Sequence, residues 1–197
     1  MTLLPDGTIP VLLSHFEQVS DVNRRRISEF EQRRDWDGLA RFAQDNLTLD
    51  KSNSDWWLVA GYAYSQGGQR QRAIECYSEV VRLAPEDALG WSLLAQSYRL
   101  AGQTERALQI LHRSFDVRRD APEPWYLLGE IYSEQGRTEQ ATQAYGQAIQ
   151  VDQRYAPAWF GLGKAYKRLG RSADLNKVTQ VLEKLDPALA KELAVQK

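Results

Sequence analysis

Apolar and polar residues alternate along this chain with the spacing of helices, and one arrangement returns four times. In each stretch, large and small apolar residues stand three, four and seven positions apart, which places them on one side of an α-helix. A second apolar stripe with spacings of four and three follows after a glycine. The pattern therefore predicts pairs of antiparallel helices that pack along these stripes and are joined by tight turns.

Three residue types return at intervals of 34 residues. Because they share one phase over four units, they indicate a repeating structure. The positions are Trp57, Trp91, Trp125 and Trp159, then Tyr64, Tyr98, Tyr132 and Tyr166, and then Gly68, Gly102, Gly136 and Gly170.

The residues of the first unit show what each position is expected to do. A small residue, Gly61, lets the second helix approach closely, while Trp57 and Tyr64 on either side fill the space around the contact. We interpret these aromatic residues as core. Gly68 follows, and it supplies the permissive backbone that a tight turn between helices requires.

The order W-x2-L-G-x2-Y, then A, then an aromatic residue, then P, resembles the tetratricopeptide repeat. The resemblance covers about residues 54 to 187. It implies an all-α, right-handed superhelical solenoid of antiparallel helix pairs, with the first helices lining a concave surface. The last unit departs from the pattern, since Leu175 and Thr179 stand where alanine and a bulky residue are expected. Its second helix is predicted to be shifted in register or splayed.

A stack of repeats leaves an apolar face open at each end, so the terminal segments are expected to cover it. Asp186 before Pro187 predicts a capping helix over 187–195. Ser14 and Glu17, in capping-box spacing, predict a helix over about 16–33, and Trp36 opens a stretch that resembles a second helix. The predicted segments are an extended lead-in (1–13), a degenerate helix pair (14–53), four repeats (54–87, 88–121, 122–155 and 156–186) and a C-terminal cap (187–197).

Composition and charge exclude several classes of function. The chain has 25 basic and 26 acidic residues and a net charge of −1, so no broad field attracts nucleic acid or an anionic membrane. No stretch approaches the roughly 18 apolar residues of a membrane-spanning helix, and the N-terminus has no signal-peptide pattern. The single cysteine favours a reducing compartment. We therefore predict a cytoplasmic protein with no membrane or nucleic-acid partner.

Few residues are candidates for catalysis or metal binding. His15 and His112 are distant in sequence and belong to no nucleophile, phosphate or metal motif. We predict that the chain is not an enzyme and has no cofactor or metal. Cys76 is interpreted as a space filler of a helix, with a redox-sensing thiol as the alternative. The arginines at 24–26 are about 100° apart on a helix and are interpreted as a solvated face.

Places two, five, nine and twelve of each first helix lie about 150° from the core stripe and are expected to face the concave groove. Tyr62, Tyr126 and Phe160 are large and apolar at such places, so we predict that they anchor a partner peptide or helix. The alternative is that they pack against neighbouring units. The predicted partner-binding residues are Leu58, Tyr62, Ser65, Leu89, Ser92, Gln96, Arg99, Glu123, Tyr126, Glu130, Ser133, Phe160, Lys164, Lys167 and Arg168.

Charge along these positions is uneven. The third unit contributes acidic residues and the fourth basic ones, which suits a ligand with an acidic end and a basic middle. The carboxylate clamp of chaperone-tail binders is not predicted, because its lysine and asparagine donors are missing. The matching residues are Leu58, Tyr62, Leu93, Glu123 and Leu127.

The leading hypothesis is a scaffold, adaptor or assembly factor that binds another protein. The alternative hypothesis is a self-associating module that forms homo-oligomers through its terminal repeats.

Overall fold

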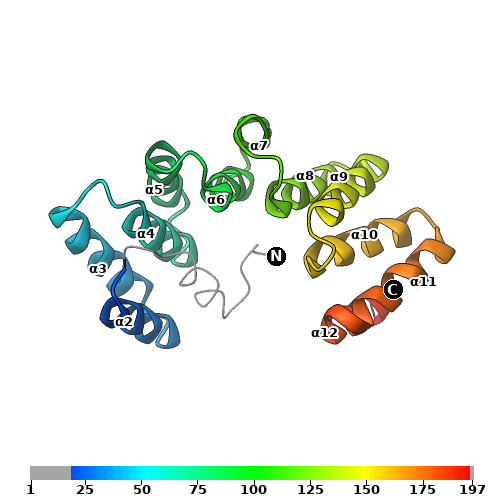
Figure 1. Cartoon of the computed structure of the whole chain (residues 1–197), viewed down its shortest axis with the longest axis horizontal. Helices are drawn as coiled ribbons and strands as arrows, with labels where there is room; N and C mark the ends of the chain where they lie inside the picture. The colour runs from blue at the N-terminus through cyan, green and yellow to red at the C-terminus, as the bar shows by residue number, and fades with distance from the viewer. Residues whose placement is uncertain (1–18, 196–197) are drawn as a thin grey trace. The chain divides into compact units, whose positions relative to one another are not determined.

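Residues 19–195 are described by a computed structural model, and within that range the chain forms eleven α-helices and no strand (Figure 1). The prediction of an all-α repeat solenoid is confirmed. The chain divides into two compact units, Met1–Ala107 and Leu108–Lys197. The helices are α2 (Asp21–Gln32), α3 (Trp36–Leu49), α4 (Ser54–Gln66), α5 (Arg70–Leu83), α6 (Ala88–Leu100), α7 (Thr104–Val117), α8 (Pro122–Glu134), α9 (Thr138–Val151), α10 (Ala156–Arg168), α11 (Ser172–Leu185) and α12 (Pro187–Val195).

Helix lengths and starting points repeat with the sequence period. The first helices α4, α6, α8 and α10 have 13 residues each, and the second helices α5, α7, α9 and α11 have 14. Helix α3 also has 14 residues and begins at Trp36, one period before Arg70. It therefore takes the place of a second helix, with α2 as its partner.

The turn inside each helix pair uses a left-handed residue. Gly68 has a φ of 75°, and Gly102, Gly136 and Gly170 lie between 69° and 75°. Only glycine takes this conformation without a steric cost from Cβ. Arg34 stands one period before Gly68 and is the described non-glycine residue with a positive φ, at 52°. The degenerate pair thus has the same left-handed turn residue, with arginine in place of glycine.

The small residues of the first helices sit directly against the second helices. A Cβ built on Gly61 would lie 2.6 Å from Tyr77 Cε1, and one on Gly129 would lie 2.5 Å from Tyr145 Cε1. Both rings are 1% exposed. A Cβ on Gly161 of α10 would also meet Tyr145, at 2.6 Å, so this ring lies between glycines of two first helices.

The recurring tryptophans are half-buried, so their assignment to the core is only partly right. Each indole N–H donates to the carbonyl six residues earlier, just beyond the end of the preceding helix. The tryptophan thereby holds its helix to the loop before it. The N–O distances are 2.9 Å for Trp57 to Lys51, 2.7 Å for Trp91 to Pro85, 3.2 Å for Trp125 to Arg119 and 2.8 Å for Trp159 to Gln153.

The recurring tyrosines each carry an arginine over the ring. The guanidinium carbon lies 5.4 Å from the centroid of Tyr64, and the other three distances are between 4.4 and 5.9 Å. Such contacts are cation–π interactions, and each joins the end of a first helix to the start of the second. The pairs are Arg72 with Tyr64, Arg106 with Tyr98, Arg137 with Tyr132 and Arg171 with Tyr166.

The first described helix, α2, covers part of the helix predicted over about 16–33. Its first residue is Asp21, and the Ser20 hydroxyl oxygen accepts from the Asn23 backbone N–H at 3.3 Å. The prediction of one continuous helix is wrong at Ser20, which is in an extended conformation and acts as the N-cap, while residues 16–18 lie outside the described residues. The capping-box pair Ser14 and Glu17, like the lead-in 1–13, lies outside the described residues.

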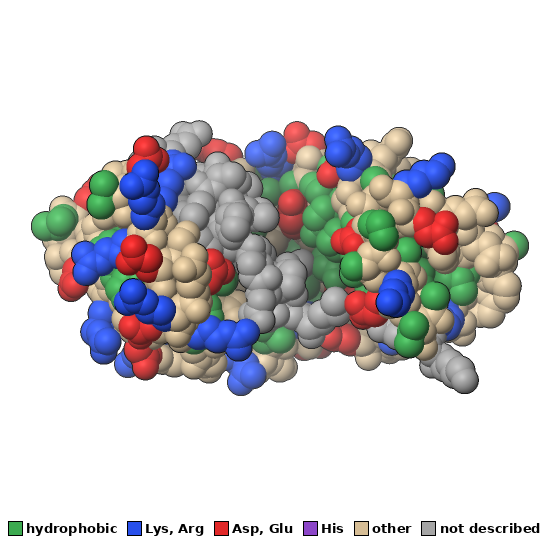
Figure 2. Space-filling view, turned by 90° about the horizontal axis from the view of Figure 1, so that it is seen from below, with side chains coloured by type: hydrophobic (Ala, Val, Ile, Leu, Met, Phe, Trp, Pro, Cys, Tyr) green, Lys and Arg blue, Asp and Glu red, His purple; other side chains and the backbone are tan. Residues whose placement is uncertain are grey.

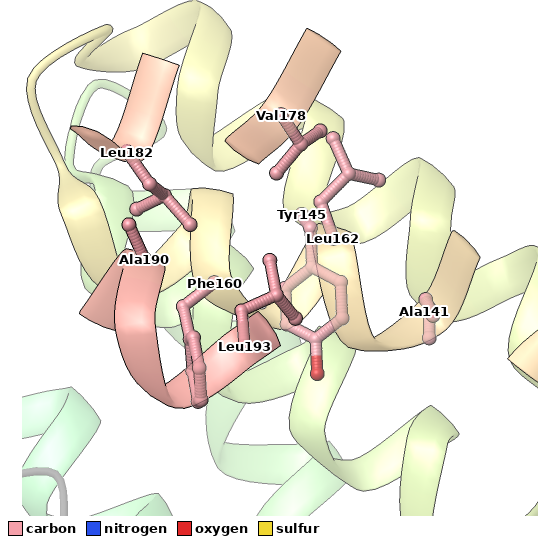
Figure 3. Close-up of a cluster of buried hydrophobic side chains, with 9 residues drawn as sticks. Ala141, Tyr145, Phe160, Leu162, Val178, Leu182, Ala190 and Leu193 are labelled. Atoms are coloured by element: carbon pink, nitrogen blue, oxygen red, sulfur yellow. The ribbon is translucent and has the colours of Figure 1, made fainter. Parts of the chain in front are cut away.

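The C-terminal end is closed by α12. Asp186 Oδ1 accepts from the backbone N–H groups of Ala188 and Leu189, at 3.0 and 3.1 Å. Ala190 and Leu193 of this helix join the buried cluster of the last repeats (Figure 3). In α11 the residues buried there are Val178 and Leu182. The helix starts in phase, and Val178 and Leu182 stand one period after the buried Ala144 and Ala148 of α9. The same side of α11 is therefore buried, although Leu175 and Thr179 themselves are only half-buried.

Candidate interaction surface

Of the fifteen predicted groove residues, Arg168 is exposed, nine are half-buried and five are buried. The five have relative exposures of 1–5%, so the prediction that they are exposed contact residues is wrong. These are Leu58, Tyr62, Ser92, Gln96 and Phe160.

Tyr62 is buried by the degenerate first pair. Its ring makes an edge contact with Trp36 of α3, with centroids 5.8 Å apart and an interplanar angle of 88°. Its hydroxyl donates to Glu31 Oε1 of α2 at 3.1 Å. This tyrosine is 3% exposed, so the alternative of packing against a neighbouring unit is the correct one.

Phe160 is buried in the other unit by the terminal helix. It belongs to the cluster that contains Ala190 and Leu193 of α12, and Figure 3 shows it beside Leu193. The ammonium of Lys164 lies 5.4 Å from its ring centroid. Phe160 therefore serves the C-terminal cap, and its predicted role as an anchor is wrong.

Ser92 and Gln96 are buried polar residues of α6. The Ser92 hydroxyl donates to the Ala88 carbonyl at 2.9 Å, and Gln96 Oε1 accepts from Arg99 Nε at 3.1 Å. The Gln96 Nε2 group is buried and has no hydrogen-bond partner among the described residues.

Helix α8 presents a different surface. Glu123, Tyr126 and Glu130 are spaced by three and four residues, so they lie along one side of the helix, and all three are half-buried. The Tyr126 ring contacts Tyr145 and Tyr155, with centroids 5.9 and 5.8 Å apart. Figure 2 shows hydrophobic side chains gathered beside acidic and basic side chains on the face that it presents.

The carboxylates act on the phenols around them. Glu130 Oε1 accepts from the Tyr145 hydroxyl at 2.7 Å. Burial, followed by the charge of Glu130, raises the pKa of Tyr145 far above its ordinary value. Burial also raises the pKa of Tyr155, and Glu123 is the largest charge that adds to the rise. Both phenols therefore stay protonated at any physiological pH.

Two basic residues of α10 cap neighbouring helices. Lys167 Nζ donates to the carbonyl of Leu193 at 3.0 Å, in the last turn of α12. Arg168 donates to the carbonyl and the hydroxyl oxygen of Ser133, at 3.2 and 2.6 Å, in the last turn of α8. Carbonyls at a helix C-terminus lack helical partners and attract cations. These two positive charges therefore have structural roles besides any contact with a ligand.

Sequence comparison identifies the repeat. Residues 129–170 match the TPR repeat family, and residues 66–148 match the family described as anaphase-promoting complex, cyclosome, subunit 3. Together with the in-phase helix pairs, these matches decide what the repeat is. The chain is built of tetratricopeptide repeats.

Solved structures share the fold of this TPR protein. A crystal structure of MamA superposes with a TM-score of 0.65 at 23% identity, covering 84% of this chain and 96% of MamA. A chain of the APC/C hetero-tetramer Cut9–Hcn1 gives a TM-score of 0.69 at 18% identity, with 80% of this chain matched to 32% of that chain. At these identities the likeness concerns the fold alone. The search of curated proteins finds no match.

The cysteine and histidine residues of the TPR protein form no reactive site among the described residues. Cys76 is 5% exposed, and burial, then the charges of Glu75 and Glu79, raises its pKa to about 12, so the thiol is unreactive. His112 is exposed, whereas His15 lies outside the described residues.

The arginine run is divided between separate contacts. Arg24 Nε donates to the Val19 carbonyl at 2.9 Å, and the Arg26 guanidinium lies 4.8 Å from the Phe42 ring centroid. Within residues 19–195, no acidic, histidine and cysteine side chains group as metal ligands, and no helix is long and apolar enough to cross a membrane.

Proposed function

We propose that this TPR protein is a non-catalytic scaffold that binds a segment of a partner protein along the first helices. The observation that carries the proposal is the half-buried stripe of α8, Glu123, Tyr126 and Glu130, which combines a fixed aromatic ring with two carboxylates. Rigid aromatic residues in a partly desolvated surface are favoured anchors at protein interfaces.

The remaining half-buried positions extend this surface within each unit. Ser65, Leu89 and Arg99 belong to the first unit, and Ser133 and Lys164 to the second. We propose them as secondary contacts. Because their side chains are polar or partly exposed, they contribute to orientation and to the rate of association more than to affinity.

The test is affinity capture from a lysate of the source cells with the full chain and a variant. Tyr126→Ala removes the ring from the proposed surface, whereas Tyr98→Ala removes a half-buried ring that lies under Arg106 instead. We expect Tyr126→Ala to lose partners that the wild type and Tyr98→Ala recover. Equal recovery by all three proteins, with each shown to be folded by circular dichroism, contradicts the proposed surface.

Self-association remains the competing proposal. It needs an open apolar face at an end of the stack, and at the C-terminal end α12 buries Ala190 and Leu193 against the last repeat. Sedimentation of the purified chain over a range of concentrations separates the two proposals. A monomer at all concentrations supports the scaffold, and concentration-dependent assembly supports self-association.

A further inference from the structure

The α8 stripe has the side chains of a site that binds a positive charge. Glu123 and Glu130 stand seven residues apart, two helical turns, with Tyr126 between them on the same side. A side chain that reaches the Tyr126 ring therefore has a carboxylate on each side along the helix axis. This arrangement suits a cation and repels a carboxylate.

The aromatic centre of the stripe is held in place before any ligand binds. Tyr126 packs at a tilt of 41° against Tyr145 and edge-on, at 75°, against Tyr155. Tyr145 is itself fixed between Gly129 and Gly161. A ring that is already immobilised loses little conformational freedom on binding, which favours affinity.

The carboxylates of the stripe act on the phenols around Tyr126. After burial, the charge of Glu130 is the largest cause that raises the pKa of Tyr145. After burial, Glu123, Tyr126, Glu130 and Asp152 raise that of Tyr155. The geometry agrees, since Glu130 accepts from the Tyr145 hydroxyl beside Tyr126. A cation on the Tyr126 ring therefore lies close to negative charge.

We propose that Glu123, Tyr126 and Glu130 hold an arginine or lysine side chain from a partner segment, with the cation on the Tyr126 ring and the carboxylates beside it. The proposal rests on the proposed function, and it names the chemistry of the partner at that surface. Arginine is favoured over lysine, because its planar guanidinium stacks on a ring and binds carboxylates with paired hydrogen bonds.

The neighbouring helix gives the segment a direction. Lys164 of α10 is half-buried and lies over Phe160, so its ammonium is held at the surface. We expect an acidic side chain of the bound partner segment to contact the Lys164 ammonium where the segment crosses α10. Lys167 and Arg168 contribute less, because each already caps a helix through a backbone carbonyl.

The experiment is selection of random twelve-residue peptides, displayed on phage, against the full chain. We expect the selected peptides to share an arginine or lysine. The affinity of one selected peptide is then measured with the double variant Glu123→Gln, Glu130→Gln. Glutamine at 130 keeps an acceptor for the Tyr145 hydroxyl, so the fold is retained while both charges are removed. Two lost charge contacts predict a dissociation constant roughly fivefold to thirtyfold higher.

The control carries the same charge change elsewhere in the unit. Glu139→Gln with Glu183→Gln removes two exposed carboxylates of α9 and α11, and it is expected to leave the affinity unchanged. A further arm replaces Tyr126 by leucine, which keeps apolar volume but removes the aromatic face. We expect a roughly twofold to fivefold loss of affinity for this variant, since an exposed cation–π contact contributes about 0.5–1 kcal/mol.

The outcomes separate this inference from the proposed function. Selected peptides without a shared basic residue, or with an affinity that the glutamine variant leaves unchanged, overturn the cation receptor while a peptide-binding surface stands. Failure to select any peptide overturns the binding surface itself, and the cation receptor with it. An equal loss in the glutamine variant and its control attributes the effect to net charge and also rejects the site.

Discussion

Replacing Gly61 with alanine is expected to destabilise the first repeat, although the same change in an exposed helix is stabilising. The new Cβ would lie 2.6, 2.8 and 3.0 Å from three ring carbons of Tyr77, against about 3.5–4.0 Å for an ordinary contact. Tyr77 is 1% exposed, so its ring has no free space to move into. Overpacking of this kind costs about 1–3 kcal/mol.

Helix propensity works in the opposite direction. Alanine is favoured over glycine inside a helix by about 1 kcal/mol, so the net loss for Gly61→Ala is up to about 2 kcal/mol. For a chain of this size, that lowers the melting temperature by up to about 8 °C. Thermal unfolding followed by circular dichroism measures the change.

Gly146 is the matched control. It lies inside α9, and a Cβ built on it has nothing within 4 Å. Gly146→Ala therefore keeps the propensity gain of up to about 1 kcal/mol without the clash, and it is expected to raise the melting temperature. If Gly61→Ala raises it as well, the close approach of the two helices is refuted.

A second substitution tests the cause of the loss. The second repeat carries Ala95 and Leu111 at the places that Gly61 and Tyr77 occupy in the first, and both are fully buried. Tyr77→Leu should therefore cost less stability in the presence of Gly61→Ala than alone. We expect a coupling energy of about 1 kcal/mol in the double-mutant cycle. Additive losses would show that the ring is not what opposes the Cβ.

Other substitutions test further features of the fold. Arg34→Gly should raise the free energy of unfolding by about 1 kcal/mol, because φ is 52° there, and a lower midpoint in urea would contradict this strain. Trp125→Phe should lower it by about 1 kcal/mol through loss of the indole N–H bond, which a denaturant titration measures. Tyr62→Phe removes the bond to Glu31 and should cost about 0.5–1.5 kcal/mol, whereas an exposed anchor would cost nothing. At pH 8 iodoacetamide should alkylate Cys76 roughly a thousandfold more slowly in the folded chain than in urea, since a raised thiol pKa keeps the reactive thiolate scarce until the pH approaches 12.

The repeat could be predicted from the sequence because its determinants are local. The turn requires glycine at 68, and the close approach of a ring requires a small residue at 61, so these residue types recur in each repeat. The structure shows the reason, because Gly68 has a positive φ and Gly61 lies against Tyr77. Even the strained turn at Arg34 could have been found by counting one period back from Gly68.

The role of the tryptophans was harder to predict. Spacing places Trp125 on the core side of its helix, and it does stack on Phe115 at 4.1 Å. The hydrogen bond from its indole depends on where the preceding helix ends, which the hydrophobic pattern does not encode. The result is a half-buried residue that joins successive helices, where the pattern indicated a fully buried one.

The prediction that Tyr62 and Phe160 are exposed anchors was wrong for a related reason. A helical wheel gives the direction in which a side chain points, but not what covers it. Tyr62 and Phe160 point away from the stripe of their own helix, and each is covered by a terminal element, α2 and α3 in one case and α12 in the other. Those elements depart from the repeat consensus, so the consensus could not show the contact.

Charge, more than aromatic content, should set the specificity of the α8 stripe. Phe160, an aromatic residue at an inner position, packs against the terminal helix α12. Lys167 and Arg168, in the last turn of α10, donate to backbone carbonyls at the ends of α12 and α8. Glu130, by contrast, accepts from the hydroxyl of Tyr145, which packs against Tyr126. A carboxylate beside an immobilised ring discriminates between partners by the sign of their charge, so a partner that places a carboxylate there is repelled. Rejection of such partners, as much as attraction of basic ones, would then define what this TPR protein binds.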